Sequence, residues 1–110
     1  MLVNLTPHEV RIIVEGGPDV VLPPSGQIAR VSTTSESCGF TPEGVPVSRL
    51  TFGETVGLPG CAGEEDYDVN YVVSTLVRQA NYLRTDLFSP GELVRSPEGQ
   101  PIGCRGLVRN

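Results

Sequence analysis

Glycine and proline interrupt this chain at short intervals, and their spacing limits it to short strands joined by turns. The 110 residues include 13 glycines and 10 prolines. Between them lie short runs rich in β-branched residues, and only one run has helical periodicity. We therefore predict one α+β domain over residues 1–110, a mainly antiparallel β-sheet or half-barrel with one helix packed on it.

Alternating apolar residues and turn signals locate the expected strands. We expect them at residues 9–14, 20–22, 27–32, 45–52, 69–73, 92–95 and 101–108, the first two forming a hairpin. Residues 55–58 are expected to pair back on the strand before them. The polar stretch 33–44 and the acidic stretch 59–68 are expected to be exposed loops.

One helix is predicted at about residues 74–84. Ser74 is a good N-cap, because its hydroxyl can accept a hydrogen bond from a backbone N–H of the first turn. Leu76, Ala80 and Leu83 follow at helical spacing and, joined by Val77, predict one buried stripe.

The basic residues are all arginines. The sequence has no lysine and a net charge of −5, with no basic stripe, which argues against general nucleic-acid binding. A Walker A loop and Schiff-base chemistry both need a lysine and are excluded. Recognition of an anion therefore falls to arginine, whose planar fork suits phosphate and carboxylate groups.

Cysteine and histidine are few and widely spaced. Cys38, Cys61 and Cys104 contain no Cys-x-x-Cys pair, and His8 is the single histidine, so we expect no metal site and no cofactor. The acidic run 64–66 is expected to be a solvated face rather than a metal site. No signal segment or membrane-length apolar run stands out, so we expect reduced thiols, no membrane contact and a cytoplasmic location.

Several polar residues are candidates for binding a ligand, although each has a simpler structural role. Arg84 is placed to pair with Asp86, Ser74 to cap the helix, and Pro24-Ser25-Gly26 to form a plain turn. His8 belongs to a turn leading into a strand. The full candidate set for ligand binding is Arg30, Arg84, Ser25, Gly26, Ser74, Tyr71 and His8.

Arg30 has two possible surroundings. Strand alternation puts it on one face with Ile28 and Ser32, opposite Ala29 and Val31. If the Ile28 face is buried, the guanidinium must be paired with an anion; if that face meets solvent, Arg30 needs no special partner.

A series of short segments carries a resemblance along nearly the whole chain. In order they are Asn4-Leu5-Thr6-Pro7-His8, Leu22-Pro23-Pro24-Ser25-Gly26, Ala29-Arg30-Val31-Ser32, Gly44-Val45-Pro46-Val47, Gly57-Leu58-Pro59, Tyr71-Val72-Val73-Ser74 and Arg84-Thr85-Asp86. In this order the chain resembles a family of small proteins encoded in phages, prophages and actinobacterial genomes. The resemblance implies that genomic setting and assigns no catalytic residue.

Three functions fit these observations. The first is a phage accessory protein, a homo-oligomer in the host cytoplasm, that sequesters a small anionic, nucleotide-derived immune signal. The second is an enzyme that degrades such a nucleotide, with His8 and either Glu9 or Asp86 as acid and base. The third is a structural phage protein, or one that blocks a host protein through exposed strand edges.

Overall fold

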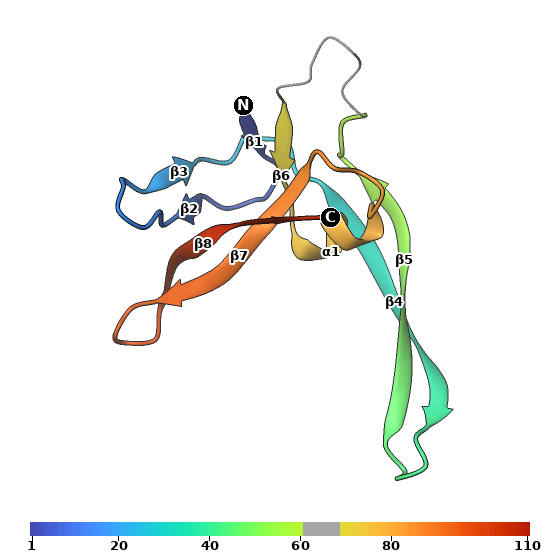
Figure 1. Cartoon of the computed structure of the whole chain (residues 1–110). Helices are drawn as coiled ribbons and strands as arrows, with labels where there is room; N and C mark the ends of the chain where they lie inside the picture. Colours follow the sequence, from blue (N-terminus) through green and yellow to red (C-terminus); the bar gives the residue numbers. More distant parts are fainter. Residues whose placement is uncertain (61–68) are drawn as a thin grey trace.

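A six-stranded sheet is the largest element of the computed structural model, which describes residues 1–60 and 69–110. Figure 1 shows this sheet curling into a nearly closed half-barrel. The predicted β-rich α+β half-barrel is therefore confirmed. In spatial order the strands are β1 (Leu2–Asn4), β6 (Asn70–Val72), β7 (Leu87–Arg95), β8 (Pro101–Arg109), β2 (Val10–Ile12) and β3 (Val20–Leu22).

The ladders of this sheet differ in length. The long β7–β8 ladder and the β2–β3 hairpin are antiparallel, whereas β1–β6 and β6–β7 are short parallel pairs. β8 meets β2 at a single parallel pair, Ile12 with Cys104. There a Cβ on Gly103 would lie 2.9 Å from the carbonyl oxygen of Arg11, so glycine is needed for the two strands to approach.

Two small groups of buried side chains make the core. The barrel cluster consists of Val10, Ile12, Val72 and Cys104, from β2, β6 and β8. The helix-side cluster consists of Leu5, Ala29, Val73, Val77 and Leu87, with Val31, Leu58 and Tyr71 packed against it. The second cluster joins the half-barrel, the helix and the start of β4 into one unit.

The helix is shorter than predicted. α1 spans Thr75–Ala80, and Ser74 caps it by accepting a hydrogen bond from the Val77 N–H at 3.3 Å. Asn81 ends it with non-helical backbone angles. The predicted buried stripe is wrong, because Val77 is buried whereas Leu76 is 42% exposed and Leu83, beyond the helix end, is 81% exposed.

A long hairpin stands apart from the sheet. β4 (Arg30–Phe40) and β5 (Pro46–Val56) pair only with each other, and in Figure 1 they extend away from the remaining elements. We call this hairpin the arm. The arm root is the place where residues 28–31 and 55–60 meet the helix-side cluster. We call everything else the body.

The arm overturns two expectations. Residues 33–40 are strand rather than loop. Their serines and threonines pair with residues of β5, as at Thr33, Thr34, Ser35 and Ser37. Residues 55 and 56 complete β5 instead of turning back. β2 and β3 form the predicted hairpin, β6 and β8 follow the predicted ranges closely, and β7 begins earlier than expected, at Leu87.

In the body, the side chain of Asn110 forms hydrogen bonds with the C-terminal end of α1. The Asn110 side-chain amide donates to the carbonyl oxygens of Arg78, Asn81 and Arg84 at 3.1–3.2 Å, and its carbonyl accepts from the Arg78 guanidinium at 3.1 Å. The Arg78 and Asn81 carbonyls also accept from the backbone N–H groups of Asn81 and Arg84, at 3.2 and 3.0 Å. The Asn110 side chain thus adds a second donor at the C-terminal end of the helix.

Candidate functional site

The candidate ligand residues fall into two groups in the structure. His8, Ser25 and Gly26 lie on loops beside the end of β1. Arg30, Tyr71, Ser74 and Arg84 lie on segments that adjoin the helix-side cluster.

The first group is organised by Asn4, a buried polar residue that the sequence did not single out. Its amide donates to the carbonyl oxygens of His8 and Leu22 at 2.8 and 2.9 Å, while its oxygen accepts from the N–H and hydroxyl of Thr6. The carbonyl of Asn4 also accepts from the N–H of Ser25 at 3.0 Å. These bonds fix the loop backbone, and the His8 residue as a whole is exposed.

The second group surrounds the arm root. Arg30 follows buried Ala29, Tyr71 packs on the helix-side cluster, and Ser74 caps the helix that supplies Val77 to that cluster. The Arg84 guanidinium donates to the carbonyl oxygen of Pro59 at 2.6 Å, next to Leu58 of the same cluster. Segments far apart in the sequence therefore meet at one place.

The structure shows on which face of β4 Arg30 lies. Ala29 is buried and Val31 packs on the helix-side cluster, so Arg30 lies on the opposite, solvent-facing side of β4. Within residues 1–60 and 69–110, its guanidinium makes no ion pair or hydrogen bond. Its cross-strand neighbour is Val56, which is 59% exposed.

Arg84 and Asp86 form the strongest ion pair in the described part of the chain. The Arg84 guanidinium donates twice to the Asp86 carboxylate, at 2.6 and 3.0 Å, and both side chains are largely buried. The bond from Arg84, reinforced by its charge, holds the pKa of the Asp86 carboxyl below its ordinary value, against the opposing effect of burial. This pair ties β7 to the segment that follows the arm.

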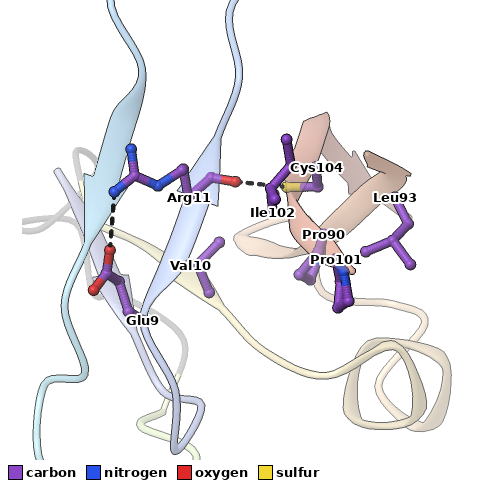
Figure 2. A pocket seen from close by; sticks show the side chains of 9 residues that line it. Glu9, Val10, Arg11, Pro90, Leu93, Pro101, Ile102 and Cys104 are labelled. Atoms are coloured by element: carbon purple, nitrogen blue, oxygen red, sulfur yellow. Dashed lines mark hydrogen bonds and ion pairs between the residues drawn. The ribbon is translucent and has the colours of Figure 1, made fainter. Parts of the chain in front are cut away.

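The described surface includes an apolar groove and a smaller hollow. A groove of about 310 Å³ lies where β8 and β7 part from β2, lined mainly by apolar side chains including Val10, Leu93 and Ile102. Figure 2 shows Arg11 beside it, paired with Glu9 at 3.7 Å. A smaller hollow of about 210 Å³ follows the end of α1 and includes Arg84. Of the candidate ligand residues, only Arg84 lines either place.

The two described cysteines differ in their exposure to solvent. Cys38 is exposed on the arm and Cys104 is buried in the barrel cluster, and both thiols are free. Cys61 and the acidic run 64–66 lie outside the described residues. In the part of the chain that is described, no three metal-ligating side chains gather, and no helix is long and apolar enough to cross a membrane.

Comparisons with protein-family models, curated proteins and solved structures give no match to this chain. The geometry of the arm and its root therefore carries the functional argument.

Proposed function

We propose that this protein is a homo-oligomeric binding protein that sequesters a small anionic, nucleotide-derived ligand against Arg30 at the arm root. The observation that supports the proposal is that the segments carrying four candidate residues, from β4, β6, α1 and the segment before β7, adjoin one core cluster, with Arg30 on the solvent-facing side of β4. A site assembled from distant segments on a packed base holds its groups in fixed positions, which reduces the ordering cost of binding.

Arg30 is the proposed anion contact. It is a cation without an ion pair among the described residues, and it stands beside the exposed side chain of Val56. When a ligand covers this apolar surface, the guanidinium loses water and requires an anion. A ligand phosphate supplies that charge and matches the planar donor fork.

Binding is favoured over degradation because the two carboxylates that could act with His8 are already paired with arginines. Asp86 is held by Arg84, which lowers the pKa of its carboxyl and makes it a weak proton acceptor. Glu9 is paired with Arg11. In the genomic setting implied by the resemblance, the ligand is a host immune signal and the place of action is the host cytoplasm.

Calorimetry against a panel of cyclic and ADP-ribose-type nucleotides tests this proposal. We expect one class to bind, and to be recovered intact after the protein is denatured by heat. Arg30→Ala should weaken binding by roughly 30-fold or more. Arg49→Ala, which removes the same charge further out on the arm, should leave affinity unchanged. Absence of binding across the panel, or equal losses in both variants, would refute the proposal.

A second candidate function is favoured by the arm itself. A hairpin that projects from the body suits a virion or assembly protein, or one that blocks a host protein by contact. This function predicts co-purification with virions or with one host protein, and no nucleotide binding. The calorimetric panel therefore separates the two candidates.

A further inference from the structure

Beyond its root, the arm is a two-stranded ladder whose described residues are almost all exposed. β4 and β5 run for 11 residues each, and neither pairs with any strand of the body. At about 3.3 Å per residue the arm is roughly 35 Å long. An isolated hairpin is marginally stable in water at best, because it has no sheet or helix to bury a face against. Such a long hairpin needs a partner surface.

The register separates the arm into two different faces. Cross-strand partners share a face, so Thr33 with Phe52 and Ser35 with Leu50 lie on one side, together with Ser37 and Ser48. Thr34 with Thr51 and Glu36 with Arg49 lie on the other. We call the first the neutral face and the second the charged face.

Between residues 33 and 37 of β4 and residues 48 and 52 of β5, the neutral face exposes large apolar side chains on β5 only. Leu50 is 50% exposed and Phe52 is 38% exposed, and neither belongs to a core cluster. The facing positions on β4 are the small hydroxyl residues Thr33, Ser35 and Ser37. The face therefore has a ridge along β5 and a shallow strip along β4.

We infer that the neutral face of the arm packs against a second copy of this chain. In a two-fold pairing, the ridge on β5 of one copy lies over the strip on β4 of the other, so large side chains meet small ones twice. Because the face carries no charge, it neither repels its own copy nor buries an unpaired ion.

The solvent-exposed area of the chain is large enough for a second copy to cover part of it. The chain exposes 7535 Å², whereas a compact monomer of its mass exposes roughly 5,900 Å². Its radius of gyration is 16.7 Å, against roughly 13 Å for a compact domain of this length. The excess area is about twice the 800 Å² that one partner contributes to a standard interface. The inference deepens the proposed function and rests on it only for the presence of more than one copy.

Light scattering after size-exclusion chromatography tests the inference on the full chain. Wild-type protein should have a mass of at least two protomers at about 100 µM. The double variant Leu50→Asp/Phe52→Asp should raise the dissociation constant roughly 100-fold or more and elute as one protomer, since it places charge inside the contact. Its circular dichroism should retain the body, because both positions lie outside the core clusters.

The matched control places the same charges on the charged face. Thr34→Asp/Thr51→Asp places one charge on each strand of the arm and should keep the wild-type mass. A monomeric wild-type protein, or equal dissociation by both double variants, would overturn the inference. Monomeric protein that still binds a nucleotide through Arg30 would overturn the arm contact and leave ligand binding standing, whereas an assembled protein without nucleotide binding would do the reverse.

Discussion

The body and the arm use the same kinds of residue for opposite purposes. In the body, no solvent reaches Leu5 and Val73, which directly follow three-residue strands, or Leu87, which begins the nine-residue β7. In the arm, Leu50 and Phe52 lie in an 11-residue strand and are left in solvent. The difference shows that strand length does not determine burial here. What determines it is whether a second layer covers the strand, and only the body has one.

The largest test of this contrast is to truncate one leucine in each region. Leu87→Ala should lower the free energy of unfolding by about 3 kcal/mol at every protein concentration, because it leaves a cavity in the helix-side cluster. Leu50→Ala should lower it by less than about 0.5 kcal/mol in dilute protein. Urea denaturation at several protein concentrations measures both. A large loss from Leu50→Ala in dilute protein would show that the arm already has a covering layer within one copy.

A smaller effect is expected where the arm joins the body through Arg84 and Asp86. Asp86→Asn should lower the free energy of unfolding by about 2 kcal/mol at pH 7, because it removes the charge that Arg84 binds. Asp19→Asn, at the exposed pair with Arg11, is the control and should cost less than about 1 kcal/mol.

The same pair sets a pH dependence. Because the pKa of Asp86 is lowered in the folded state, the unfolded chain binds the proton more readily. The contribution is fully present above about pH 4, the range of an ordinary aspartate, and is lost as the pH falls through the folded pKa. Acid denaturation followed by circular dichroism should therefore be less steep for Asp86→Asn. Identical acid transitions for wild type and variant would contradict this.

The smallest expected effect concerns the helix end. Asn110→Ala removes the amide shared among three carbonyl groups and should cost about 1 kcal/mol. Hydrogen exchange should rise first at the amides of Arg78 and Asn81. Arg109→Ala is a neighbouring control that leaves the cap in place. Equal effects of the two substitutions would mean that the segment matters for its strand pairing and not for the cap.

The sequence predicted much of the body because its signals there are local. Alternation in Val10–Ile12, the turn before Val20 and the N-cap at Ser74 each specify a short element through neighbouring residues. The helix end was missed because Leu83 continues the apolar spacing, whereas the Asn81 side chain bonds the Val77 carbonyl and Thr55, and the helix stops there.

The arm was half missed for a different reason. Its second strand has apolar residues, whereas its first strand is rich in Ser and Thr, which are also typical of loops. A local signal did exist: Thr41-Pro42-Glu43-Gly44 is a turn closed by the Gly44 N–H on the Thr41 carbonyl at 2.9 Å. Around such a turn, the flanking stretches form a hairpin. The role of Asn4 had no comparable signal, since its partners lie in two separate loops and at the end of β3.

The single bridge between Ile12 and Cys104 has a consequence for how the body opens. A long β-ladder resists separation because many backbone hydrogen bonds must break at once. The seam between β2 and β8 has one paired position and therefore few such hydrogen bonds. Across this line the β2–β3 hairpin and the β6–β7–β8 group are held by that pair, by the bond from the Ile13 N–H to the Cys104 carbonyl, and by the buried side chains of the barrel cluster. The attachment therefore depends mainly on side-chain packing, and we expect a side chain at Gly103, where the two backbones meet, to loosen it.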